Sequence, residues 1–187
     1  MSASPPSVPG QPAMLRDHFA LFSLPRRFAI DAAALAEAYR RVLGGVHPDR
    51  FAAAPDAERR MAMQVATQVN EAHRVLRDPT RRAAYLCTLL GVDVEAESNT
   101  AMPLEFLVQQ MEWREALAEA RAARDAAALA ALRAALDAQA ASLQAGLADA
   151  LDVRADAREA ASLTRRMMFL DKFRSEIDAA QDALLDA

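Results

Sequence analysis

Residues 31–79 read DAAALAEAYRRVLGGVHPDRFAAAPDAERRMAMQVATQVNEAHRVLRDP, and this stretch decides the fold of the first half of the chain. Apolar side chains recur every three or four residues in two parts of it, which is the spacing of an amphipathic helix. The first stripe comprises Leu35, Tyr39, Val42 and Val46, and the second comprises Met61, Val65, Val69, Ala72 and Leu76. Pro48 lies between the stripes and stops the first helix. The stretch therefore predicts an antiparallel hairpin of two helices, with a polar bend exposed at its tip.

The ends of both predicted helices carry residues that favour a helix boundary. Asp31 can accept a backbone hydrogen bond as the N-cap of the first helix, and Ile30 can pack against Leu35 in a hydrophobic staple. The pair Gly44-Gly45 weakens the end of that helix, because glycine is a poor helix former. The pair Asp78-Pro79 closes the second helix.

The bend at the tip has residue types that suit contact with another protein. Pro48 fixes its own φ and biases His47 toward an extended conformation, so little conformational entropy remains to be lost on binding. Asp49 offers a short carboxylate for charge-assisted hydrogen bonds. A local positive field comes from Arg40, Arg41 and Arg50. Pro and Asp are also ordinary turn residues, so the tripeptide alone would indicate only a turn.

The second half of the chain predicts three more helices. The first spans roughly 102–122, where Pro103 suits a helix start because its missing N–H costs nothing there. The second is marked by the stripe Leu129, Leu132, Leu136, Leu143, Leu147 and Leu151. The last runs from about 155 to 185 and carries Leu163, Met167, Leu170, Phe173, Ile177 and Leu184 on one side. Each helix can bury one stripe against the other two, so we expect an antiparallel three-helix bundle with crossings of about 20°.

These elements predict an all-α protein with two domains. We expect a disordered leader, a first domain, a linker and a bundle domain over residues 1–14, 15–91, 92–101 and 102–187, respectively. The first domain adds a short helix near 17–23 before the hairpin and a fourth helix from about 80 to 90. Gly91 can end that fourth helix with a left-handed cap.

The helix predicted at 102–122 has two apolar faces. An advance of about 100° per residue places two clusters on nearly opposite sides. The first cluster is Met102, Phe106, Trp113 and Leu117, and the second is Leu104, Leu107, Val108 and Met111, flanked by Glu112, Glu115 and Glu119. One face can pack inside the bundle, so the other is left for the first domain, a dimer partner or another protein. On the last helix, Met168 points away from the apolar stripe and Phe169 lies at its edge, which leaves the same alternatives open.

The composition argues against several classes of protein. A formal net charge of −4 argues against a nucleic-acid binder. No stretch approaches the length and apolarity of a membrane span, and the N-terminal residues are not a secretory signal. The lone cysteine, Cys87, excludes a disulfide framework or a multi-cysteine metal site within one chain, and its apolar neighbours predict a small buried side chain. We expect a soluble protein of the reducing cytoplasm, without membrane contact and without a metal or other cofactor.

Catalytic chemistry is not predicted either. His47 and Asp49 could form an acid–base pair, but no nucleophile motif, phosphate-binding glycine loop or second convergent carboxylate accompanies them. The other two histidines, His18 and His73, lie in predicted helical segments. These residues favour an adaptor over an enzyme.

The motifs of the first half resemble a J-domain, the module that stimulates ATP hydrolysis by DnaK-family chaperones. The matching segments are DHFALFSLP (17–25), HPDRF (47–51), NEAHRVLRDP (70–79) and RRAAYL (81–86). The chain as a whole is similar to the HscB family, the J-type co-chaperones of bacterial iron–sulfur cluster assembly. The C-terminal signatures of that family fall at Phe106-Leu107, Glu112, Arg114-Glu115 and Phe169-Leu170-Asp171-Lys172.

This resemblance implies two separate binding surfaces. Contact with an ATP-bound HscA/DnaK-family chaperone would come from His47, Pro48, Asp49, Arg50, Arg40 and Arg41. Contact with IscU, the scaffold on which iron–sulfur clusters are assembled, would come from Leu107, Val108, Met111, Glu112, Glu115, Glu119 and Phe169. His73 takes the place of a packed aromatic ring, which implies a half-buried structural role. The alternative is a general J-domain co-chaperone that has another client or a dimerising bundle, so self-association stays open.

Overall fold

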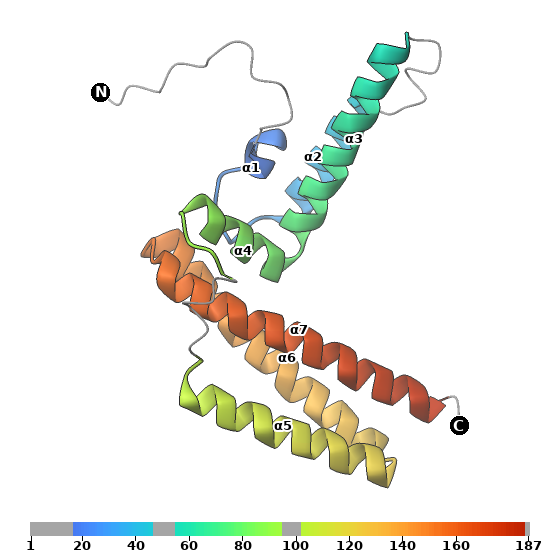
Figure 1. Ribbon diagram of the computed structural model, residues 1–187, viewed down its shortest axis with the longest axis vertical. Coiled ribbons are helices and arrows are strands. Elements are labelled where there is room, and N and C mark those ends of the chain that lie inside the picture. Colours follow the sequence, from blue (N-terminus) through green and yellow to red (C-terminus); the bar gives the residue numbers. More distant parts are fainter. Residues whose placement is uncertain (1–16, 47–54, 95–101, 186–187) are drawn as a thin grey trace. The chain divides into compact units, whose positions relative to one another are not determined.

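The computed structural model describes residues 17–46, 55–94 and 102–185, and over these ranges the chain is all-α, without a strand (Figure 1). The elements are α1 (His18–Leu21), α2 (Ala32–Val46), α3 (Asp56–Arg77), α4 (Pro79–Leu89), α5 (Leu104–Ala123), α6 (Ala126–Ala148), the π-helical turn η4 (Asp149–Val153) and α7 (Ala157–Leu185). The predicted fold class is confirmed. In the part of the chain that is described, no helix combines the length and apolarity needed to cross a membrane.

The chain forms two compact units, which we call the hairpin unit and the bundle unit. The hairpin unit comprises Met1–Arg26 and Ile30–Asp78, and the bundle unit comprises Arg27–Ala29 and Pro79–Ala187. This division by packing differs from the predicted division, which placed the fourth helix with the hairpin. The physical reason is that α4 packs on α7, where the Thr80 hydroxyl donates a hydrogen bond of 2.5 Å to the Asp171 carboxylate.

In the hairpin unit, α2 and α3 run side by side and α1 packs on α3 (Figure 1). The buried side chains are Phe19, Phe22, Leu35, Ala38, Ala62, Ala66, Val69, Ala72 and Leu76. The predicted hairpin of helices is therefore present. α2 continues through Gly44 and Gly45 and is helical up to Val46, the last described residue before the tip. The tip itself, residues 47–54, lies outside the described residues.

The stripe predicted for α3 is confirmed at Val69, Ala72 and Leu76, which are buried, and is wrong at its first two positions. Met61 is 57% exposed and Val65 is half-buried, whereas Ala62 and Ala66 are buried. Ala62 and Ala66 lead to Val69 in steps of four and three residues, which is also a helical spacing. The small alanine side chains let α2 and α3 approach closely, and the long Met61 side chain is left on the outside.

The predicted helix boundaries are confirmed where the structure describes them. Asp31 Oδ1 accepts hydrogen bonds from the N–H groups of Ala33 (2.8 Å) and Ala34 (3.3 Å), as an N-cap does. Gly91 has a φ of 78° at the end of α4, and the Val92 N–H donates to the Cys87 carbonyl at 2.9 Å. This left-handed position favours glycine because it has no Cβ.

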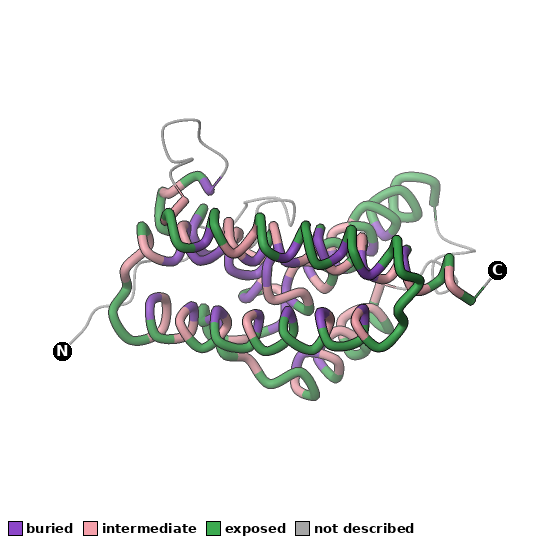
Figure 2. The backbone as a smooth tube through the Cα atoms, turned by 90° about the horizontal axis from the view of Figure 1, so that it is seen from below, coloured by how far each residue is buried: buried purple, intermediate pink, exposed green. Residues whose placement is uncertain are grey.

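In the bundle unit, α5, α6 and α7 form the predicted three-helix bundle, and α4 lies against α7 (Figure 1). Along each helix, buried residues alternate with exposed ones in the pattern of amphipathic packing (Figure 2). The leucine stripe of α6 and the apolar stripe of α7 are buried, except that Leu184 is half-buried. Leu151, predicted to continue the stripe of α6, lies in the π-helical turn η4 and is half-buried. Much of the predicted linker, residues 95–101, lies outside the described residues, as does the predicted leader.

The π-helical turn η4 joins α6 to α7 and holds a segment from far away in the sequence. The carboxylate of Asp152 accepts hydrogen bonds from the N–H groups of Phe28 (2.6 Å) and Ala29 (2.9 Å). The Phe28 ring is buried, and the guanidinium of Arg82 lies 4.9 Å from its centroid. We call these contacts the Asp152 clamp. They explain why residues 27–29 pack with the bundle unit.

Candidate partner-binding surfaces

Most of the predicted chaperone-binding residues fall between α2 and α3 in the sequence. His47, Pro48, Asp49 and Arg50 are outside the described residues, so their role stays a prediction. Arg40 and Arg41 are described, and both are exposed toward the end of α2. They are therefore available to a partner that approaches this end of the helix.

His18 and His73, the two histidines among the described residues, are both partly buried in the hairpin unit. His73 stacks on the ring of Tyr39 with a centroid distance of 4.0 Å, and the Tyr39 hydroxyl donates a hydrogen bond of 2.9 Å to Asn70. Burial, and then the nearby Arg77, lower the pKa of His73, and burial lowers the pKa of His18. The half-buried role of His73 as a packed ring is confirmed. Over the ranges that are described, no group of three or more His, Cys, Asp or Glu side chains could hold a metal ion.

The lone cysteine is buried, as predicted. Cys87 is fully covered on α4, and burial is the main cause that raises the pKa of its thiol. A raised pKa keeps the thiol protonated, and the thiolate is the reactive form. Cys87 therefore behaves as a small core residue.

The inner face of α5 is anchored in the bundle by large side chains. Phe106, Trp113 and Leu117 are buried, together with Ala120. The rings of Phe106 and Trp113 meet edge to face at 6.4 Å, a favoured aromatic arrangement. This inner face fixes the rotation of α5, and with it the direction of the opposite face.

The opposite face of α5 is exposed and apolar. Leu104 is 74% exposed, Met111 71%, Val108 47% and Leu107 42%. We call these four residues the outer face of α5. Its carboxylate neighbours are Glu112, Glu115 and Glu119, which are exposed and form no ion pair within the described residues. The prediction that this helix has two apolar faces is confirmed.

Phe169 differs from the other predicted scaffold-binding residues. It is half-buried on α7 in an aromatic cluster, with ring centroids 5.7 Å from Phe106, 6.4 Å from Trp113 and 5.8 Å from Phe173. The guanidinium of Arg114 lies 5.9 Å from its ring. Phe169, which the sequence places at the edge of the apolar stripe, therefore belongs in part to the core, because its ring packs against residues that anchor α5. Met168, its neighbour, is exposed as expected.

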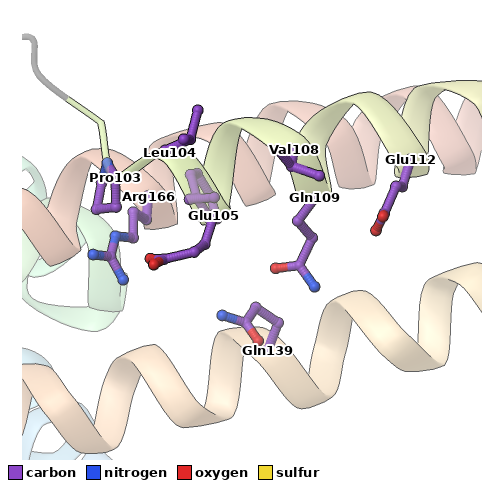
Figure 3. A pocket seen from close by; sticks show the side chains of 9 residues that line it. Pro103, Leu104, Glu105, Val108, Gln109, Glu112, Gln139 and Arg166 are labelled. Carbon is purple, nitrogen blue, oxygen red and sulfur yellow. The ribbon is translucent and has the colours of Figure 1, made fainter.

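A hollow of about 540 Å³ lies beside the outer face, between α5, α6 and α7 (Figure 3). Leu104 and Val108 belong both to the outer face and to the lining of the hollow. Gln109 points from α5 toward α6, and Gln139 points from α6 toward α5 (Figure 3). This hollow could not be predicted from the sequence, because its residues come from three helices and have no local pattern.

Two family descriptions match the chain, one over each half. Residues 17–85 match the "DnaJ domain", and residues 102–178 match the "HSCB C-terminal oligomerisation domain". The first match includes the tip residues and the second includes all predicted scaffold-binding residues.

Curated relatives and solved structures agree with these matches. The co-chaperone protein HscB homologs of Azoarcus sp. (strain BH72) and Bordetella pertussis are each 53% identical, over 90% and 88% of this chain and 96% of each relative. The chaperone HscB from Vibrio cholerae superposes with a TM-score of 0.80 at 35% identity, covering 90% of this chain and 99% of that one. The human co-chaperone protein HscB gives 0.84 at 26% identity, covering 93% of both chains.

Proposed function

The chain belongs to the HscB family of J-domain co-chaperones, and on this premise we propose that it stimulates ATP hydrolysis by an HscA/DnaK-family chaperone. We also propose that it delivers the iron–sulfur scaffold IscU to that chaperone in the cytoplasm, which aids the maturation of iron–sulfur proteins. Hydrolysis takes place on the chaperone. This chain supplies proximity and shifts the conformational population of its partner.

The chaperone half of the proposal is supported by the DnaJ match and by the presence of the two packed helices that flank the tip segment in the sequence. α2 and α3 pack against each other and bury Leu35 and Ala38 on α2 and Ala62, Ala66 and Val69 on α3. The segment between Val46 and Asp56 joins these two helices in the sequence. The sequence of that segment contains Pro48, whose ring fixes its own φ, and Asp49, whose carboxylate can form charge-assisted hydrogen bonds.

The test of the chaperone half is Asp49→Asn. We expect this variant to fold normally and to lose stimulation of the chaperone's ATPase, because the amide lacks the charge of the carboxylate. Asp182→Asn is the matched control, since Asp182 is exposed on α7 and far along the chain from the tip. Steady-state ATPase assays compare the two variants. Stimulation by Asp49→Asn at the level of the control would reject the docking role.

The scaffold half of the proposal is carried by one observation, the outer face of α5. These four apolar side chains are all exposed, Leu104 and Met111 most of all, and exposed apolar clusters of this kind mark interaction sites. Met111 is an adaptable side chain, and the acidic border favours a partner with basic residues. An acidic border also predicts that binding weakens as salt rises, because salt screens exposed charges.

The test of the scaffold half is the double variant Leu107→Ala/Met111→Ala, which leaves Phe169 in place. Each change removes three heavy atoms, and about 0.8 kcal/mol is lost per buried methylene-sized group. If docking buries about half of the six removed atoms, the binding free energy falls by about 2 to 2.5 kcal/mol, and the Kd for the scaffold should rise about 30- to 100-fold. Isothermal titration calorimetry with the purified scaffold protein measures this change.

The matched control for this test is Met63→Ala/Leu185→Ala, because both residues are exposed and lie outside α5. We expect the control to bind the scaffold normally and both double variants to melt at the wild-type temperature. Equal binding by the two double variants would remove the scaffold role from the outer face.

Self-association is a second candidate role for the bundle unit. The matching family description names an oligomerisation domain, and the outer face of α5 could be covered by a second copy of the chain. Sedimentation of the wild type and of Leu107→Ala/Met111→Ala distinguishes the roles. A dimer that the double variant abolishes would favour self-association, whereas a monomer in both cases favours the scaffold.

A further inference from the structure

The hollow beside the outer face of α5 is lined by polar side chains from three helices (Figure 3). They are Glu105, Gln109 and Glu112 on α5, Gln139 on α6 and Arg166 on α7. Glu105 and Arg166 point into one end of the hollow, and the two glutamines face each other across its middle (Figure 3). We call these five residues the polar set.

The polar set has no hydrogen-bonding partners of its own within the described residues. The two glutamines and the two glutamates form no hydrogen bond or ion pair there. The guanidinium of Arg166 lies 5.7 Å from the centroid of the Phe106 ring, and its Nε is buried without a hydrogen-bond partner. Buried polar atoms are nearly always satisfied in native proteins, so an unsatisfied one calls for an explanation.

The chemistry of the polar set matches a ligand that both donates and accepts hydrogen bonds. Arg166 only donates, the two carboxylates only accept, and each glutamine does both. A simple anion would meet the two carboxylates, and a simple cation would meet the guanidinium. A peptide main chain carries alternating N–H and C=O groups, so it can satisfy both kinds of side chain.

The dimensions of the hollow agree with a short piece of extended chain. It runs along α5 from Pro103 to Glu112, and a helix rises about 1.5 Å per residue, so its length is about 13 Å. An extended chain advances about 3.3 Å per residue, so about four residues fit.

The hollow is also continuous with the outer face of α5. Leu104 and Val108 line the hollow and are themselves part of that face. A protein docked on the outer face would therefore reach the rim of the hollow without further movement.

We propose that the hollow binds an extended segment of about four residues from the protein docked on the outer face of α5. This inference rests on the proposed scaffold role, and the segment belongs to the scaffold. Gln109 and Gln139 pair with its main chain from the two sides, and Arg166 donates to one of its carbonyl or carboxylate oxygens. Gln139 thereby becomes a specificity-determining residue on α6, a helix outside the predicted scaffold-binding set.

The test fills the hollow from α6 and leaves every residue of the outer face unsubstituted. Gln139→Arg places a long cationic side chain in the hollow, and Gln144→Arg makes the same change at a half-buried glutamine of α6 that does not line it. Calorimetry with the purified scaffold protein should show a Kd at least about tenfold higher for Gln139→Arg and within about twofold of wild type for Gln144→Arg. Circular dichroism melts of both variants check that the bundle is intact.

Two outcomes would overturn the inference. Either Gln139→Arg binds the scaffold as the wild type does, or both variants weaken binding equally, which would reflect added charge and not the hollow. These outcomes are separate from failure of the proposed function, because Leu107→Ala/Met111→Ala tests the outer face independently.

Hydrogen exchange of the bound scaffold tests the extended segment itself. At saturating concentration, the wild type should protect one continuous run of scaffold amides that the Gln139→Arg complex leaves unprotected. Protection elsewhere on the scaffold should be the same in both complexes. Identical protection of that run in both complexes, or protection scattered over separate positions only, would overturn the inference.

Discussion

Removal of the Asp152 carboxylate should release the segment that it holds. In Asp152→Ala, the N–H groups of Phe28 and Ala29 lose their shared acceptor. The side chain of Asp152 is only 9% exposed, so solvent screens its hydrogen bond with Phe28 little. Arg27 also lies 3.6 Å from the carboxylate, but its side chain is half exposed and the ion pair adds little.

The size of the effect follows from the two hydrogen bonds. A hydrogen bond to a charged group contributes about 1.5 to 3 kcal/mol, and a buried donor left without a partner costs its desolvation. The bond from Phe28 is partly buried and counts in full, whereas the bond from Ala29 is exposed, and its N–H regains water when the carboxylate is gone. We therefore expect a loss of about 3 kcal/mol, which corresponds to amide exchange about 150-fold faster at these positions.

The assay is hydrogen–deuterium exchange on a peptide that covers residues 27–29. The matched control is Asp149→Ala on the same π-helical turn, where the carboxylate pairs with Arg154 near the surface. Loss of that exposed pair should cost at most about 1 kcal/mol and leave the exchange of residues 27–29 unchanged. Unaltered protection in Asp152→Ala, or an equal loss in the control, would refute the reasoning.

Three further predictions concern stability. Burial lowers the pKa of His73, so the unfolded chain binds more protons than the folded chain once the pH falls below the ordinary histidine pKa of about 6.5, and the protein loses stability there. Thermal melts at pH 7.5 and 5.5 should show a smaller loss of stability for His73→Phe than for the wild type, with the remaining loss due to His18. An identical loss in both proteins would contradict this. Gly91→Ala should destabilise the protein by about 1 to 2 kcal/mol because φ is 78° there. Gly45→Ala, in the last turn of α2 with nothing within 4 Å of the added Cβ, should stabilise it by about 0.5 to 1 kcal/mol. Urea unfolding measures both changes, and equal signs would exclude this explanation. Phe169→Ala should lower the melting temperature where Leu107→Ala/Met111→Ala does not, because only Phe169 belongs to the aromatic cluster; an unchanged melting temperature would place the ring outside the core.

Helical periodicity predicted the bundle because each long helix has a stripe of large side chains. The stripe from Leu129 to Leu147 leaves only one face of α6 that can enter a core. The same geometry separated the two faces of α5, since one buries Trp113 and the other exposes Met111. A small bundle covers one face of each helix, so the exposed cluster could be predicted from the sequence.

Periodicity was less informative where small and large residues alternate. In α3, the positions of Met61 and Ala62 differ by one residue, and either can begin a stripe that reaches Val69. Hydrophobicity favours methionine, whereas close packing of two helices favours alanine. The burial of Phe169 was also hard to predict, because its position at the edge of a stripe does not reveal how many aromatic rings surround it.

Contacts between distant parts of the chain could not be predicted at all. The hydrogen bond from Phe28 to Asp152 spans 124 positions, and that from Thr80 to Asp171 spans 91. The hollow is likewise lined by Gln109 from α5 and Gln139 from α6, which are far apart in the sequence. Helix propensity and apolar spacing are local properties, and they carry no information about which polar side chains meet after folding.

The packing of α4 on α7 has a consequence for dissecting this protein by truncation. A fragment cut after Gly91, at the boundary that the sequence suggests, would take α4 away from the helix that covers it. Leu86 and the Cys87 thiol would then meet water, and the thiol would recover its usual acidity and become open to alkylation and intermolecular oxidation. Aggregation or oxidation of such a fragment would therefore result from the truncation, because in the intact chain this thiol is buried and unreactive.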